Sequence, residues 1–269
     1  MAGSSYIMRG GAEGRERLRL LSRVLAPGTR ALFDRSGLRP GLSCLDVGTG
    51  GGDVARDLAR RVAPTGRVVG TDIDEEGLTI ARSEAAAAGI ANLAFVAHDA
   101  GSGPVEPGGF DIVHARFLLS HLADPAAALA AMAASLAPGG LLLLQDADVA
   151  GHFCYPPSPA HDRYLALYVA AATARGGDPG IGPKLPAMLV DLGLGGVDLA
   201  VTQPAAMAGE TKRMSPITLA TIADSLIDLG LARPDEIVGL LGELEALAAD
   251  DRTVLGLPRV VQCWGRRPR

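Results

Sequence analysis

Short apolar runs alternate with longer amphipathic segments along most of this chain. Seven of these runs have the length and composition of buried strands. They span residues 43–48, 66–72, 93–99, 110–115, 141–147, 197–203 and 259–265. Strands separated by helical segments are typical of a parallel sheet with helices on both faces. The pattern therefore predicts an α/β fold, a Rossmann-like, doubly wound sheet of seven strands.

The segments between the strands carry helical signals. Apolar side chains recur every four positions in residues 53–62, and Gly89 stands where a left-handed residue commonly follows a helix. Asp124 and Pro125 predict the cap and the first residue of another helix. We expect the Pro-Gly-Gly at 138–140 to close that helix.

The pattern changes after the fifth strand, yet it indicates one domain throughout. We expect residues 1–40 to form a helical lead, and residues 41–147 to form the core that carries a glycine-rich turn and would bind a cofactor. Prolines flank a helical piece in 148–190, which predicts an insertion that covers the sheet edge and not another βα unit. A second helical block spans 205–250, and the last strand lies in 259–268. We expect the two blocks to cover a substrate pocket.

Composition and charge argue against several classes of function. The 269 residues are 48% hydrophobic, which is enough for a sizeable core, and the net charge is -5. This acidic balance and the few aromatic residues argue against nucleic acid as a partner. The three cysteines, Cys44, Cys154 and Cys263, form no paired motif, so we expect no disulfide framework, no metal site and a reducing cytoplasm. With no signal-peptide pattern and no apolar span of about 18 residues, we expect no membrane association.

The segment LDVGTGGGDVA at 45–55 carries the clearest chemical signal. A buried strand that enters a glycine turn and then a helix is typical of nucleotide-cofactor sites. Gly48 and Gly50 fit the dinucleotide pattern, but Asp53 replaces its third glycine and Asp46 precedes the turn. A carboxylate there opposes a pyrophosphate and suits the ammonium and sulfonium of S-adenosylmethionine. The alternative is that Asp46 only orders the turn by binding backbone amides.

Two more acidic residues follow the next strands. Asp72 ends the second strand, where it can accept hydrogen bonds from both ribose hydroxyls, whereas we expect Asp74 to cap the following helix. Asp99 follows the third strand and can accept from the adenine amino group. A helix cap or a solvated turn is the alternative for Asp99.

The motifs DVGTGGG, GTDID, HDA, FDIVHARFLLSHLADP and LAPGGLLLLQD resemble, in order and spacing, those of the class I S-adenosylmethionine-dependent methyltransferases. The resemblance covers about residues 40–150, and the terminal VVQCWGRRP resembles the family's antiparallel last strand. It implies that Asp46 and the glycine turn hold the methionine moiety, that Ile73 packs on adenine, and that the Ala115 carbonyl reaches the methionine. The implied cofactor residues are Asp46, Gly48, Thr49, Gly50, Asp53, Asp72, Ile73, Asp99, Ala100, Ala115 and Arg116. Arg116 could instead bind an acidic acceptor or order its loop.

The N-terminal YIMRGG and RERLRLL resemble the lead segment of a small-molecule, natural-product branch of this family. This resemblance implies that Tyr6 and Arg17 fold over the cofactor, with Arg17 binding its carboxylate through a bidentate fork. The alternative for Arg17 is a solvated helix face. A homodimer joined through the N-terminal helices is compatible with the sequence.

Methyl transfer requires alignment and exclusion of water more than it requires catalytic side chains. For a hydroxyl acceptor a histidine base would help. We select His152, after the fifth strand, and then His121, after the fourth, with a surface loop and a backbone contact as their alternatives. We expect His98 and His114 to be structural, and His161 to be solvated.

The sequence therefore predicts methyl transfer from S-adenosylmethionine to a small, largely apolar acceptor, with O-methylation ahead of C- or N-methylation. One alternative is a protein that binds S-adenosylmethionine without transferring a methyl group, as a sensor or a rearrangement catalyst. A nicotinamide-dependent oxidoreductase is the other, and Asp46 and the glycine spacing disfavour it.

Overall fold

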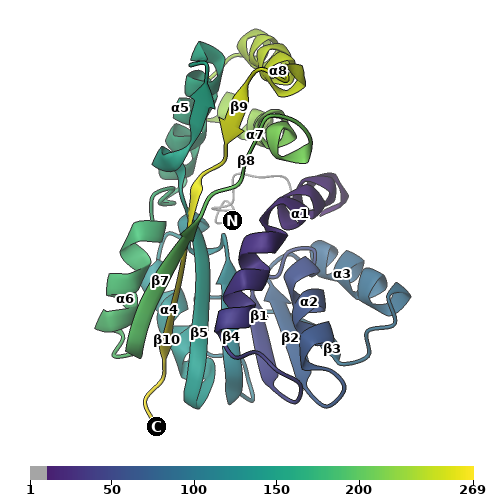
Figure 1. Cartoon of the computed structure of the whole chain (residues 1–269), viewed down its shortest axis with the longest axis vertical. Helices are drawn as coiled ribbons and strands as arrows, with labels where there is room; N and C mark the ends of the chain where they lie inside the picture. The colour runs from purple at the N-terminus through teal and green to yellow at the C-terminus, as the bar shows by residue number, and fades with distance from the viewer. Residues whose placement is uncertain (1–10) are drawn as a thin grey trace.

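The structure is a computed structural model that describes the backbone of residues 11–269 and the side chains of residues 14–269. Its centre is a seven-stranded sheet in the order β3-β2-β1-β4-β5-β10-β7 (Figure 1). The strands are β1 (Ser43–Val47), β2 (Arg67–Asp72), β3 (Leu93–Ala97), β4 (Phe110–Arg116), β5 (Leu136–Asp148), β7 (Gly195–Thr202) and β10 (Arg259–Arg266). β1 to β5 pair in parallel, and β10 runs antiparallel to both of its neighbours. The predicted fold class is confirmed, including the antiparallel last strand.

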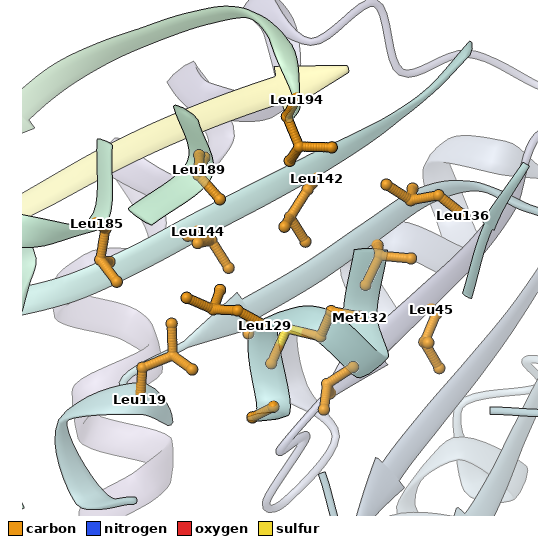
Figure 2. Close-up of a cluster of buried hydrophobic side chains, with 14 of the residues drawn as sticks. Leu45, Leu119, Leu129, Met132, Leu136, Leu142, Leu144, Leu185, Leu189 and Leu194 are labelled. Carbon is orange, nitrogen blue, oxygen red and sulfur yellow. The ribbon is translucent and has the colours of Figure 1, made fainter. Parts of the chain in front are cut away.

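Helices cover both faces of the sheet. On one face lie α1 (Gly11–Arg35), α2 (Asp53–Val62) and α3 (Glu75–Ala87), which share an apolar core with alternate residues of the strands. On the other face lie α4 (Pro125–Ser135) and α6 (Leu185–Asp191). Figure 2 shows leucines of α4 and α6 directed toward Leu142 and Leu144 of β5. The two cores explain why the strands read as continuous apolar runs.

A third apolar cluster lies beyond one end of the sheet. It joins α5 (Pro159–Ala174), α7 (Met214–Asp228) and α8 (Pro234–Ala249), which are at the top of Figure 1. A small antiparallel sheet of β6 (Phe153–Tyr155), β9 (Val254–Gly256) and β8 (Ala205–Ala206) lies beside them. We call α5, α7 and α8 the cover. α6 does not belong to the cover, because Leu185 and Leu189 are buried in the core of the sheet. Of the segment 148–190 that was expected to cover the pocket, α5 is therefore the helix that belongs to the cover.

Local signals set the helix ends. Asp124 accepts a hydrogen bond from the amide of Ala127 at 2.9 Å and caps α4, and Gly89 has a φ of 67° just after α3, as predicted. The prediction that residues 138–140 close α4 is wrong, because β5 begins at Leu136. Pro-Gly-Gly instead lies inside β5, where its register against β4 shifts and Gly139 adopts a φ of 80°.

α1 crosses its face of the sheet and packs against elements of its own chain. Leu32 and Phe33 are fully buried in the core shared with α2 and α3, whereas Leu20 joins a small cluster with Met214 of α7. The lead helix thus connects the sheet to the cover. A homodimer through this helix stays a prediction.

None of the described helices is both long and apolar enough to cross a membrane.

Candidate active site

A cavity of about 810 Å³ opens where α1, the cover and the strand ends β1, β2 and β4 meet. Ligands of open α/β sheets bind in this position, outside the carboxyl ends of the strands. Most of the predicted site residues line it: Arg17, Asp46, Gly48, Thr49, Gly50, Asp53, Asp72, Ile73, Asp99, Ala100, Arg116, His121 and His152. The fold therefore brings together residues that are up to 135 positions apart in the sequence, from Arg17 to His152.

Two predicted residues are not among those that line the cavity. Ala115 is buried in the core on the α4 side of β4. The period of two along the strand turns its side chain away from the face that bears His114. The predicted contact of Ala115 is through its carbonyl, and it stays a prediction. Tyr6 lies outside the described residues.

The glycine turn is tight for steric reasons. Gly48 and Gly50 have φ angles of 66° and 52°, in the left-handed region that favours glycine. A Cβ atom on Gly48 would lie 2.9 Å from the Leu118 side chain, and one on Gly50 would lie 3.3 Å from Leu18 of α1. The turn thus requires glycine both for its backbone and for the close approach of its neighbours.

Asp46 is buried at the start of this turn, with only 3% of its side chain exposed. Its Oδ2 accepts a hydrogen bond from the Thr49 hydroxyl at 2.6 Å, and its Oδ1 lies 2.7 Å from Nδ1 of His114. These partners are side chains, whereas the alternative role required backbone amides. The carboxylate is therefore held in one orientation beside the cavity.

A row of buried polar side chains crosses four neighbouring strands behind Asp46. Gln262 donates to the carbonyl of Gly28 and to Oε1 of Gln145, each at 2.9 Å. A carbonyl only accepts hydrogen bonds, so the side-chain nitrogen of Gln262 must be the atom that faces Gly28. The same nitrogen donates to Gln145, so the side-chain oxygen of Gln145 faces Gln262 and its nitrogen faces His114. The Gln145 amide group lies 2.8 Å from Nε2 of His114 and donates to it. Nδ1 of His114 consequently carries the proton and donates to Asp46.

The acidic residues of the next strands have mixed roles. Asp72 accepts from the amides of Gly50 at 2.7 Å and Asp74 at 3.1 Å, and burial raises its pKa. Asp74 caps α3 as predicted, since it accepts from Gly77 at 3.1 Å. Asp99 is exposed and accepts from Gly101 within its own turn at 2.9 Å, the geometry of the solvated-turn alternative. Ile73 is exposed beside the cavity, a position compatible with packing on a nucleoside base.

Asp53 takes part in an ion-pair cluster that fastens α1. Arg15 of α1 donates to Asp53 at 2.6 and 3.0 Å and to Glu84 of α3 at 2.6 and 2.9 Å. Arg56 of α2 also binds Asp53. Asp53 therefore already has two cationic partners, which reduces the charge that it can offer a ligand.

Three arginines line the cavity, and Arg15 is already paired with Asp53 and Glu84, which leaves Arg17 and Arg116. Arg17 is only 8% exposed, so the alternative of a solvated helix face is wrong. Its Nε donates to the hydroxyl of Thr218 of α7 at 3.3 Å. Arg116 donates to Thr29 of α1 at 3.1 Å, and burial lowers the pKa of its guanidinium.

The two candidate bases are neutral at physiological pH. Burial, together with the nearby charge of Arg17, lowers the pKa of His121 to about 4. Burial also lowers the pKa of His152 to about 4, although Nδ1 of this ring donates to the carbonyl of Val149 at 2.9 Å. His161 was expected to be solvated and is only 1% exposed, because the N-terminal turn of α5 packs inward next to His152.

The structure adds residues that the sequence analysis missed. Tyr164 and Tyr168 line the cavity from α5, and their spacing of four on a helix was the available signal. Phe117 follows β4 with a φ of 52°, a conformation that costs a bulky residue roughly 1–3 kcal/mol. No pattern in the neighbouring sequence predicts that conformation, because it depends on a hydrogen bond from the Phe117 amide to the carbonyl of Gln145 at 2.8 Å.

Comparison with known proteins places the chain in a family. A family model described as a methyltransferase domain matches residues 38–172. The ubiquinone/menaquinone biosynthesis C-methyltransferase UbiE of Ectopseudomonas mendocina is 37% identical over 139 residues, which cover 49% of this chain and 54% of that protein. The matched part thus spans about half the length of this curated relative.

Two solved structures share the fold. Phosphoethanolamine N-methyltransferase 2 of Haemonchus contortus, in complex with phosphomonomethylethanolamine and S-adenosylhomocysteine, has a TM-score of 0.60 and 18% identity, covering 93% of this chain and 56% of that one. The [4+2]-cyclase SpnF has a TM-score of 0.53 and 19% identity, covering 89% and 80%. The family model matches half of the chain. This chain therefore belongs to the methyltransferase-domain family, which confirms the predicted resemblance at the level of the family.

Proposed function

We propose that this protein transfers a methyl group from S-adenosylmethionine to a small, largely apolar acceptor. The observation that carries the proposal is the buried carboxylate of Asp46, held beside a glycine turn in a cavity that continues under the cover. A fixed negative charge in a poorly solvated site favours a cationic ligand and disfavours a diphosphate.

The residues present fit S-adenosylmethionine. Asp46 and the turn would hold the methionine moiety, Asp72 the ribose, and Ile73 the adenine. When bound, this cofactor supplies a methyl group on a positively charged sulfur. The chain would contribute orientation and exclusion of water, because α1 and the cover close the cavity over the turn.

The acceptor would bind at the cover end of the cavity. Apolar side chains line this end, among them Leu122, Val149, Met214 and Leu257. His152 and His121 would contact the acceptor as neutral hydrogen-bonding groups, because a pKa of about 4 makes each a weak base. O-methylation is our first proposal for the reaction. C-methylation is the second, supported by the similarity to the C-methyltransferase UbiE.

Isothermal titration with S-adenosylmethionine, S-adenosylhomocysteine and NADH tests the cofactor. We expect both adenosyl ligands to bind and NADH not to bind, and Asp46→Asn to weaken S-adenosylmethionine at least about tenfold, since a buried charged contact contributes roughly 1.5–3 kcal/mol. Tight binding of NADH alone would refute the proposal.

Labelled cofactor tests the reaction. Incubation with methyl-labelled S-adenosylmethionine and a metabolite extract should move label into a small organic product, and NMR of that product separates an O-methyl from a C-methyl group. Binding without any transfer of label would favour the sensor or rearrangement alternative.

A further inference from the structure

We infer that the acceptor is an organic acid whose anionic oxygen pairs with Arg17 at the cover end of the cavity. The inference rests on the proposed methyl transfer, and it names the class of acceptor. Arg17 lies in the cavity wall, and the described part of the chain offers it no counterion.

Arg17 and Arg15 lie two positions apart on α1, and both are almost fully buried, at 8% and 5% exposed. Arg15 has two carboxylate partners, Asp53 and Glu84. In the described part of the chain no carboxylate lies within ion-pair distance of Arg17, and its side-chain hydrogen bond goes to the Thr218 hydroxyl at 3.3 Å. A buried cation with no partner costs several kcal/mol, which a bound anion can offset.

The surroundings place Arg17 on the acceptor side. Thr218 belongs to α7, and the positive charge of Arg17 lowers the pKa of His121 and opposes the increase that burial causes in the pKa of Tyr164. Arg17 therefore lies near α5, α7 and the turn after β4. Arg116 also lines the cavity. The negative charges of Asp46 and Asp53 oppose the decrease that burial causes in the pKa of Arg116, which places this arginine toward the turn end of the cavity. Arg116 is thus available for the cofactor carboxylate.

The weak bases of the cavity lead to the same conclusion. His121 and His152 each have a pKa of about 4, so neither readily takes a proton from a hydroxyl at neutral pH. An acceptor that binds as a phenolate, enolate or carboxylate needs no such base. For reaction at oxygen, the anionic oxygen supplies the electron pair of the new bond to the methyl carbon, and no proton moves. For reaction at a ring carbon of a phenolate, the carbon next to the C–O carbon supplies the pair while the oxygen becomes a carbonyl, and the proton of that ring carbon is then released to water. In both cases the pair of the broken carbon–sulfur bond stays on sulfur as a neutral thioether.

A matched pair of probes tests the inference. 2-Naphthoate and 2-naphthamide have similar shape and differ in charge, and each is titrated into the complex with S-adenosylhomocysteine. We expect naphthoate to bind at least about tenfold more tightly than naphthamide, since a charge-assisted bond in a buried site contributes that much or more. The preference should disappear in Arg17→Gln and persist in Arg17→Lys, which retains the charge.

Arg23→Gln is the control, because Arg23 lies on the same helix, is 56% exposed and pairs with Glu210 at the surface. It should retain the preference for naphthoate. Equal binding of the two probes to the wild type, or an unchanged preference in Arg17→Gln, would overturn the inference. So would a loss of S-adenosylhomocysteine affinity in Arg17→Gln with the preference intact, because Arg17 would then hold the cofactor. Failure of the wild type to bind S-adenosylhomocysteine would instead refute the proposed function.

Discussion

Asp46 depends on a hydrogen-bonded row that begins three strands away. The orientation of His114 follows from Gln145 and Gln262, and ultimately from the carbonyl of Gly28 in α1. His114 is fully buried, and Phe33 packs edge-on against its ring at a centroid distance of 5.4 Å. His114 is thus a positioning residue for the carboxylate that we expect to select the cofactor.

Replacing His114 tests that role. His114→Leu leaves Asp46 and Gln145 without their partner, so we expect cofactor affinity to fall about tenfold and stability to fall by about 1–3 kcal/mol. His114→Asn can still donate to Asp46 from nearly the same position, and it should restore much of the cofactor affinity even if stability stays low. Titration calorimetry and urea unfolding measure the two effects.

Thr71 offers a matched control in β2, which neighbours β1 on the side opposite β4. Among the described residues its buried hydroxyl has no hydrogen-bond partner, so Thr71→Val should leave affinity unchanged and stability equal or slightly higher. Wild-type affinity in His114→Leu would contradict the positioning role.

At the scale of elements, the cluster of Arg15, Asp53, Arg56 and Glu84 fastens α1 across α2 and α3. Arg15 also lies against the glycine turn, since a Cβ atom on Gly51 would meet its guanidinium at 2.4 Å. The cluster therefore links the position of the lead helix to the shape of the cofactor site.

Glu84→Gln should weaken this attachment in a pH-dependent way. Hydrogen bonds from Arg15 and Arg19 lower the pKa of Glu84 from 4.5 to about 2. A carboxyl group whose pKa is lowered by folding increases the free energy of unfolding. This contribution is present in full above about pH 4.5 and is lost as the pH falls toward 2. We expect the variant to be about 1–2 kcal/mol less stable at pH 7 and nearly equal to the wild type near pH 2, as measured by urea unfolding.

Glu75→Gln is the comparison on the same helix, because Glu75 is exposed and pairs with Arg82 at the surface. Such a pair contributes about 0–1 kcal/mol, so its removal should change little. A pH-independent loss in Glu84→Gln would indicate that packing, and not charge, holds α1.

The elements themselves were largely predictable. All seven strands of the central sheet were located from apolar runs. Burial on both faces leaves few polar positions in the inner strands, whereas the edge strands β3 and β7 are largely exposed and were located from apolar residues alone. β6, β8 and β9 were missed, since segments of two or three residues carry no period. α6 was taken for cover because Pro183 and Pro186 flank its start. Those prolines occupy first-turn positions, where a helix tolerates them.

At the scale of the whole molecule, α1 joins the sheet to the cover (Figure 1). The cavity is lined by residues of α1, of the strand ends and of the cover. A ligand in the turn would contact α1, β1 and β2 together, whereas α4 and α6 lie on the opposite face. Binding should therefore stabilise one face of the molecule more than the other.

Hydrogen exchange measures this asymmetry. We expect S-adenosylhomocysteine to slow exchange in the first half of α1 and in the glycine turn, because opening of either would lose bound ligand. α4 and α6 serve as internal controls and should change little. Protection confined to α7 and α8 would place the ligand in the cover and contradict the site.

The sequence by itself determined what depends on near neighbours: the strands, the helix caps, the glycine turn and the acidic residues at the strand ends. These features follow from periods of two and about 3.6 residues and from the φ angles that glycine allows. Only the tertiary structure decided which side chains meet. Arg15 and Arg17 are the same residue type two positions apart, and about 200° of helix rotation directs them to different neighbours. Arg15 meets two carboxylates beside the glycine turn, and Arg17 reaches the Thr218 hydroxyl of the cover, because α2 and α3 lie on one side of α1 and the cover on the other.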